Sequence, residues 1–176
     1  EKILSQELSS SVLVFNWGIK KSFDQLNVHN IFFAKDHLNE FDQMFNHKKI
    51  SEDSTIYIFI SSKKVPADAP KGCENWFVLL NAPSDAKADW KTIESNCRRQ
   101  ILNKLKRILG EDIEPLIEIE STLNPKQVEE ITSSFNGALY GNSSNNKMAA
   151  FLRHPNRSNQ IKNLYFVGGS VHPGGG

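Results

Sequence analysis

The chain has 176 residues, of which 39% are hydrophobic and 23% are charged, and its formal net charge is +1. This length suffices for one domain with a substantial core, and the composition excludes an intrinsically disordered chain. The low net charge argues against a nucleic-acid partner, and no apolar run approaches the roughly 18 residues of a membrane-spanning helix.

The first part of the chain is predicted to form strands and one short helix. Apolar side chains alternate along residues 12–19, as is typical of a strand, and residues 28–34 are predicted to be a second strand. Asp36 is placed to cap a helix over residues 37–47. Residues 55–61 are apolar on both faces and are therefore predicted to be a central strand.

The predicted helix over residues 37–47 lies in a segment that is dense in large apolar side chains. Leu38, Phe41 and Phe45 form a stripe on the helix, and Phe32, Phe33 and Met44 lie nearby in the sequence. Such a stripe can contact a membrane or a lipid, but a plain core stripe is the favoured interpretation. The acidic side chains on the same helix argue against contact with an anionic membrane surface.

The middle of the chain contains the longest predicted helix. Residues 64–72 carry proline and glycine and are predicted to be a loop, and residues 76–80 are another buried strand. Apolar residues recur at spacings of three and four over residues 86–109, which predicts a helix. Gly110 is a suitable residue to end it.

A further strand and helix follow. Residues 116–121 alternate between apolar and acidic side chains, which indicates a half-exposed strand near a sheet edge. Asn124 is placed to cap the next helix, and Gln127 can complete a capping box. Leu123 can then pack on Val128 across the start of that helix.

The order of these elements predicts the fold class. Residues 133–146 are rich in Gly, Ser and Asn and are predicted to be a long loop, and residues 148–152 are a short strand or a helical turn. Strands and helices do not alternate regularly, so the fold is predicted to be α+β. We expect a mixed sheet of five to six strands with helices mainly on one face, which leaves the other face free to cover a ligand or a partner.

The last fourteen residues hold the most specific local pattern. Residues 164–167 are a short apolar run, typical of a strand buried on both faces, and a glycine-rich loop over residues 168–176 follows. Glycine allows a backbone to approach a ligand closely, and such loops normally lead into a helix whose N-terminus faces an anion. We therefore expect the chain to be cut within this unit, with a flexible tail as the alternative.

The sequence assigns no catalytic side chain and no metal site. The five histidines have no metal-ligand spacing: they are His29, His37, His47, His154 and His172. No nucleophile elbow and no phosphate-binding loop occur. Cys73 and Cys97 form no metal-ligand pair, so a reducing cytoplasm is the simplest location, with a disulfide between them as the lesser alternative.

Several segments resemble the C-terminal third of bacterial phytoene-desaturase-type enzymes, the carotenoid dehydrogenases of the FAD-dependent, amine-oxidase-like superfamily. The segments are residues 30–33, 72–78, 137–146, 151–158 and 163–176. The resemblance implies a parent protein that binds FAD. It also implies that residues 1–150 form a substrate-binding domain for a long apolar polyene and that residues 151–176 begin the C-terminal FAD-contacting segment.

The same resemblance implies which residues lie near the flavin. They are Gly168, Gly169, Ser170, His172, Pro173, Gly174, Gly175 and Gly176. The implied reaction is stepwise dehydrogenation of a polyene such as phytoene, with hydride passing to the flavin. The N-terminal dinucleotide fingerprint of the family is absent from these residues, so we expect this chain alone to lose FAD and to be inactive. The parent would be cytoplasmic, with peripheral membrane contact as a further expectation.

Other functions are compatible with the same residues. A carotenoid isomerase, a saturase or a desaturase of a modified carotenoid would share the flavin-loop motif. A non-catalytic lipid-binding domain is the alternative from a different functional class. The oligomeric state is not indicated by any feature of the sequence.

Overall fold

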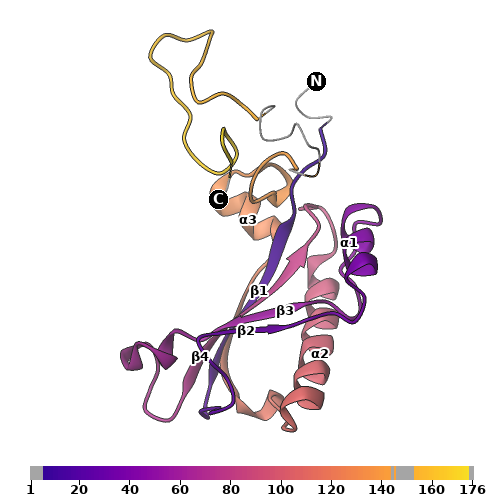
Figure 1. The fold of residues 1–176 in the computed structure, drawn as a ribbon, viewed down its shortest axis with the longest axis vertical. Coiled ribbons are helices and arrows are strands. Elements are labelled where there is room, and N and C mark those ends of the chain that lie inside the picture. The colour runs from indigo at the N-terminus through magenta and orange to yellow at the C-terminus, as the bar shows by residue number, and fades with distance from the viewer. Residues whose placement is uncertain (1–5, 144, 146–152, 175–176) are drawn as a thin grey trace.

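The structure is a computed structural model that describes residues 6–143, 145 and 153–174. Its strands and α-helices, in chain order, are β1 (Ser11–Ile19), β2 (His29–Phe32), α1 (His37–Phe45), β3 (Ile56–Phe59), β4 (Glu74–Ala82), α2 (Trp90–Leu109), β5 (Ile117–Leu123) and α3 (Pro125–Thr132). Figure 1 shows a sheet with α2 packed along it, α1 beside one end of α2, and α3 near the end of β1. The expected α+β fold is confirmed.

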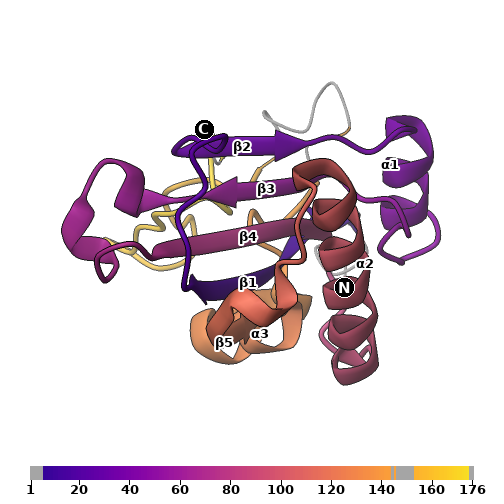
Figure 2. The same ribbon diagram turned by 90° about the horizontal axis from the view of Figure 1, so that it is seen from below.

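The sheet has five strands in the order β2-β3-β4-β1-β5, which Figure 2 shows from below. Every pairing among these described strands is antiparallel, so the expectation of a mixed sheet is wrong. The reason lies in the order of the strands. β4 and β5, which α2 connects, run in the same direction, but β1 lies between them and pairs with both.

The predicted positions of the strands in the sheet are largely confirmed. β3 has neighbours on both sides and is therefore an interior strand, as the apolar pattern of residues 55–61 predicts. β5 forms one edge, as the alternating residues 116–121 predict, and β2 forms the other. The segment over residues 148–152, predicted as a strand or a helical turn, lies outside the described residues.

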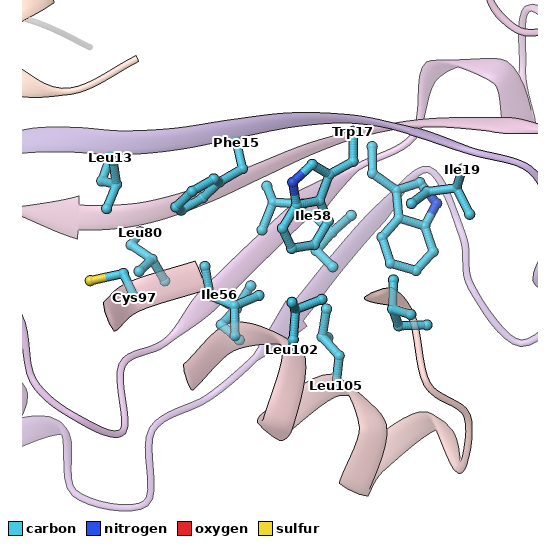
Figure 3. Close-up of a cluster of buried hydrophobic side chains, with 14 of the residues drawn as sticks. Leu13, Phe15, Trp17, Ile19, Ile56, Ile58, Leu80, Cys97, Leu102 and Leu105 are labelled. Atoms are coloured by element: carbon cyan, nitrogen blue, oxygen red, sulfur yellow. The ribbon is translucent and has the colours of Figure 1, made fainter. Parts of the chain in front are cut away.

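The main core lies between α2 and one face of the sheet. Antiparallel register places every second side chain of neighbouring strands on the same face, so β1 and β4 present matched apolar rows to the helix. Figure 3 shows these side chains reaching toward α2; the buried set includes Leu13, Phe15, Trp17, Ile19, Trp76, Val78, Leu80, Cys97, Ile101 and Leu105. We call this side of the sheet the α2 face.

The helix ends follow local capping chemistry. α2 begins at Trp90, later than predicted, because the Asp89 carboxylate accepts a hydrogen bond from the Thr92 N–H at 3.4 Å. It ends as predicted at Gly110, whose φ is 73°. The capping box of α3 is confirmed, since Asn124 and Gln127 each accept the other's backbone N–H at 2.9 Å.

α1 turns its apolar stripe outward, which contradicts the core-stripe interpretation. The Leu38 side chain is 85% exposed and Phe41 is 49% exposed, whereas Glu40 and Met44 are buried. The Glu40 carboxylate accepts hydrogen bonds from the N–H and the hydroxyl of Thr55, both at 2.7 Å. Because this polar contact anchors the helix beside β3, the face that carries Leu38 and Phe41 is directed to solvent.

A buried ion pair ties the loop after β3 to the first residue of β4. The Lys63 ammonium lies 2.6 Å from the Glu74 carboxylate, which also accepts hydrogen bonds from Ser22, from the Phe23 N–H and from the Trp76 indole. Burial acts to raise the pKa of Glu74, but Lys63 and the hydrogen-bond donors outweigh it, so that its pKa lies below the ordinary value. The charged carboxylate is therefore the form that stabilises the fold.

We expect Glu74→Gln to lower the free energy of unfolding by about 2–4 kcal/mol at neutral pH, because Lys63 is left without its buried counter-charge. The stabilisation from a lowered pKa is complete above the unfolded pKa of about 4.3 and is lost as pH falls through the folded pKa. The difference between the variant and the wild type should therefore shrink in acid. Urea unfolding at several pH values measures it.

Glu111→Gln is the matched control. Glu111 pairs with Lys21 on the surface, so its loss should change stability by less than about 1 kcal/mol. Equal losses in the two variants would contradict the structural importance of the buried pair.

Candidate functional site

The first candidate site is the face of the sheet turned away from α2. The register places Ile31 opposite Tyr57 and Tyr57 opposite Leu79, and in the next row it places Phe59 opposite Phe77. We call the surface made by these side chains the open face: Ile31, Tyr57, Phe59, Phe77 and Leu79. Successive side chains along a strand point to opposite faces of the sheet. Because the neighbours of these five residues point to the α2 face, the five themselves point to the opposite face.

The open face is apolar but only partly covered. Tyr57, Phe59, Phe77 and Leu79 are each half-buried, and Ile31 is 53% exposed. Farther along the same face, Val12 and Val14 are buried against Val128 of α3. The exposed apolar strip therefore crosses β2, β3 and β4 and ends where α3 begins to cover the sheet.

A histidine fixes the aromatic rings at the β2 edge of this face. The His29 ring nitrogen Nδ1 lies 2.7 Å from the Tyr57 hydroxyl, and the His29 ring stacks on Phe59 with centroids 5.2 Å apart. Both contacts reduce the freedom of the aromatic side chains. The result is a preorganised flat apolar surface.

The second candidate site is the segment over residues 153–174, which Figure 1 shows in yellow beyond α3. It consists of an outgoing arm, residues 153–158, and a returning arm, residues 164–172. The Ser158 N–H donates to the Leu164 carbonyl at 3.0 Å, and the Phe166 N–H donates to the Asn156 carbonyl at 2.7 Å. The arms therefore hold each other in place.

The expected buried strand over residues 164–167 is wrong in this structure. Its only ladder contact among the described residues is an isolated bridge between Arg157 and Tyr165, and Val167 is 95% exposed. An apolar run becomes a buried strand only when strands pair on both sides of it, and the described residues supply one short arm. The apolar composition of this run is therefore not matched by burial here.

The predicted flavin-contacting residues form a loop that requires glycine. Gly168 has a φ of 138° and Gly174 has a φ of 112°, conformations that residues with a side chain rarely adopt. Gly169, Ser170, His172 and Pro173 lie between them, and Gly175 and Gly176 lie outside the described residues. Their expected role toward a flavin stays a prediction.

This loop lines a cavity of about 430 Å³ between the C-terminal segment and the end of α3. Ser170 and Val171 contribute to it from the predicted flavin loop. The remaining lining residues are Leu8, Thr132, Ser133, Ser134, Phe135, Ala138, Gly141, Asn142, His154 and Phe166. Among the described residues, the wall is thus part apolar and part hydroxyl-bearing, without an acidic side chain.

The described residues contain no metal site, and the buried cysteine is not a nucleophile. Burial raises the pKa of the Cys97 thiol to about 12, and the nearby Glu94 carboxylate adds to the shift, so this thiol stays protonated and inert. Cys73 and Cys97 are both free, so the alternative of a disulfide between them is not realised. Within the described residues, no three His, Cys, Asp or Glu side chains are grouped to hold a metal ion.

Sequence reasoning predicted an uncovered face of the sheet but did not identify the side chains that form it. The signal was present, because residues 55–61 and 76–80 are apolar on both faces while the one long helix can cover only one of them. It also missed the roles of Arg153 and Asn156, which depend on contacts with a distant loop and leave no pattern in the local sequence.

No family model matches the chain. Over its whole length the chain is 57% identical to a 1-hydroxycarotenoid 3,4-desaturase from Flavobacterium sp. (strain P99-3), of which it covers 36%. It is 35% identical over its whole length to a 4,4'-diapolycopene oxygenase from Methylomonas sp, again covering 36%. The chain is a homologue of carotenoid desaturases and oxygenases.

A third relative supports the same conclusion. The chain is 34% identical over 97% of its length to a 4,4'-diaponeurosporene oxygenase from Staphylococcus haemolyticus (strain JCSC1435), of which it covers 34%. The family resemblance stated from the sequence is thereby confirmed. This homologue of the carotenoid enzymes spans about a third of the length of the relatives that it matches.

We expect the double variant Phe59→Ser with Phe77→Ser to bind an apolar fluorescent dye several-fold more weakly than the wild-type chain, because it removes the two rings at the centre of the open face. Both rings are half-exposed, so the melting temperature should fall less than for a core substitution such as Phe15→Ser. Dye fluorescence and thermal unfolding measure the two effects. Ile108→Ser, at an exposed apolar side chain of α2, is the control. Unchanged dye binding in the double variant would show that the open face is not an apolar binding surface.

Proposed function

We propose that this homologue is part of an FAD-dependent oxidoreductase that acts on a carotenoid. In this proposal residues 1–150 are the substrate-binding domain and residues 151–176 begin the C-terminal segment that contacts the flavin. The observation that supports the substrate role most directly is the open face, a preorganised apolar surface in a homologue of carotenoid desaturases and oxygenases.

The physical properties of the open face suit a polyene. A long hydrocarbon offers almost no hydrogen-bonding groups, so its binding free energy must come from apolar area removed from water, about 25 cal/mol per Å². Neighbouring strands lie about 4.8 Å apart, so the strip from β2 to β4 is about 10 Å wide, long enough for a few conjugated double bonds. The face would bind the polyene, orient it and exclude water from one side.

The identity of the relatives directs the choice of substrate. The relative with 57% identity is named for a 1-hydroxycarotenoid, and the two oxygenases are named for diapocarotenoids. We therefore propose a carotenoid that already carries a modification as the first substrate to test, ahead of phytoene. An isomerase or a saturase remains the alternative within the superfamily.

The residues of the glycine-rich loop fit a flavin. Gly168 and Gly174 adopt backbone conformations that residues with a side chain rarely reach, and the described lining of the adjacent cavity has hydroxyl groups and no acidic side chain. FAD would supply the redox step, and this chain would contribute backbone donors and an apolar wall. That division of roles agrees with the absence of an activated nucleophile among the described residues.

We expect the full-length protein that contains this chain to purify with the visible absorbance of bound flavin, and the 176-residue chain alone to be colourless. The full-length protein should reduce its flavin when it is given a 1-hydroxycarotenoid without another electron acceptor, and the chain alone should not. Spectroscopy under anaerobic conditions measures both. A colourless full-length protein that still binds the carotenoid would contradict the proposal and favour a non-catalytic lipid-binding domain.

We further propose that α1 makes peripheral contact with a membrane. None of the described helices is long and apolar enough to cross a bilayer. The exposed apolar side chains of Phe33, Leu38 and Phe41 instead lie on α1 and on the segment that joins it to β2, the edge strand that carries Ile31 of the open face. Because a carotenoid is stored in the bilayer, an apolar surface continuous with the open face would shorten its transfer.

We expect Leu38→Ser with Phe41→Ser to weaken binding of the full-length protein to neutral phosphatidylcholine vesicles by about thirtyfold in a co-sedimentation assay, since about 2 kcal/mol of apolar contact is lost. Ile108→Ser, at a similarly exposed position on α2, should have little effect. Equal binding by the two variants would contradict the assignment of the membrane contact to α1.

A further inference from the structure

Two side chains of the outgoing arm bind the carbonyl groups of the glycine-rich loop. The Arg153 guanidinium donates from Nη1 to the Gly169 carbonyl at 3.0 Å and to the Tyr140 carbonyl at 2.9 Å. The Asn156 amide donates from Nδ2 to the His172 carbonyl at 2.8 Å, and its contact with the Phe166 carbonyl is longer, at 3.4 Å. The carbonyl groups of Phe166, Gly169 and His172 therefore point toward these two side chains.

Backbone hydrogen bonds fix the two ends of the loop at the same arm. The Phe166 N–H donates to the Asn156 carbonyl at 2.7 Å, and the His172 N–H donates to the His154 carbonyl at 3.0 Å. The His154 ring meets the Phe166 ring edge to face, with centroids 4.7 Å apart. Between these anchors only residues 167–171 are left to adopt a shape of their own.

The inward carbonyl groups determine where the loop's N–H groups point. In a trans peptide the C=O and the N–H of one unit point in opposite directions. Since Arg153 holds the Gly169 carbonyl, the Ser170 N–H is directed away from Arg153. The Gly168 carbonyl accepts from the Val171 N–H at 3.3 Å, so the Gly169 N–H is directed away from Val171. Within the described part of the chain, the N–H groups of Gly168, Gly169 and Ser170 donate no hydrogen bond.

The loop is packed closely around the guanidinium. A Cβ atom at Gly174 would lie 2.6 Å from Nε of Arg153. A Cβ atom at Gly141 would lie 3.0 Å from the Cβ atom of Ser170. Arg153 thus touches the loop at Gly169 and Gly174 and the chain after α3 at Tyr140. A permanently charged fork that contacts three backbone segments is well suited to set their relative positions.

We propose that Arg153 and Asn156 are positioning residues for the flavin: they hold the carbonyl groups of residues 166–172 inward so that the free N–H groups of residues 168–170 face an acceptor on the cofactor. This inference rests on the proposed function, in which the loop contacts FAD. Neither side chain needs to touch the reacting atoms. Their effect is to preorganise the backbone donors, so that the loop does not have to become ordered when FAD binds.

The test is FAD binding by the full-length apo-protein, in the variants Arg153→Met and Asn156→Leu, which keep the approximate side-chain volume and remove the donors. Two exposed residues of the same segment are matched controls, Arg157→Met and Asn159→Leu, since neither side chain makes a hydrogen bond within the described residues. Quenching of flavin fluorescence gives the Kd. The absorption spectrum of bound flavin, which responds to its hydrogen bonds, is a second readout.

We expect Arg153→Met and Asn156→Leu each to weaken FAD binding by at least about tenfold and to shift the bound spectrum, while the control variants match the wild type. Arg153→Lys keeps the charge but not the forked guanidinium, so its FAD affinity should be intermediate. This variant replaces Arg153→Met in the test if Arg153→Met does not fold. FAD binding by the wild type with no difference between the test and control variants would overturn this inference alone. A wild type that binds no FAD would overturn the proposed function and this inference with it.

Discussion

The packing of α2 against one face of the sheet is the contact on which the rest of the structure depends. It buries Trp17 and Trp76 and their apolar neighbours on β1, β3 and β4. Because strand side chains alternate, this choice of face assigns Tyr57, Phe59 and Phe77 to the opposite side, where none of the described long helices covers them. A sheet with apolar residues on both faces and a helix on one is suited to hold an apolar ligand on the other.

The two candidate sites have complementary properties. The open face offers apolar area without a charge, whereas the segment over residues 153–174 offers backbone donors arranged by Arg153 and Asn156. Neither carries an activated nucleophile or a group of metal ligands among the described residues. In an enzyme whose cofactor performs the redox chemistry, binding and orientation are the tasks that remain for the protein. The observed distribution of residues matches these tasks.

Features fixed by short-range interactions could be predicted from the sequence. Alternation along β1, the stop at Gly110 and the capping box at Asn124 each depend on neighbours within a few residues, and all are confirmed. The outward turn of α1 could not be predicted, because it depends on the contact of Glu40 with Thr55, fifteen residues away. The apolar pattern predicted a buried strand over residues 164–167, but burial requires pairing partners, which a local pattern does not specify.

The same distinction applies to the candidate sites. The glycine-rich loop was found because positive φ angles select for glycine in the sequence itself. The contact of Arg153 with Gly169 was not, since it joins a side chain to a backbone carbonyl sixteen residues away and would be possible for many arginines. An uncovered face of the sheet was expected, but the side chains that form it were not identified, for a related reason. Whether an apolar strand face is covered depends on the number and placement of helices, not on the strand.

The central claim is that the open face binds the polyene, and site-directed photo-crosslinking in the full-length protein tests it most directly. A benzophenone side chain would replace Phe59, with Ile108 on the outer side of α2 as the control position. After irradiation with bound 1-hydroxycarotenoid, the account predicts protein that carries covalent carotenoid absorbance from the Phe59 position and none from the Ile108 position. Crosslinking of equal yield at both positions, or at Ile108 alone, would contradict it.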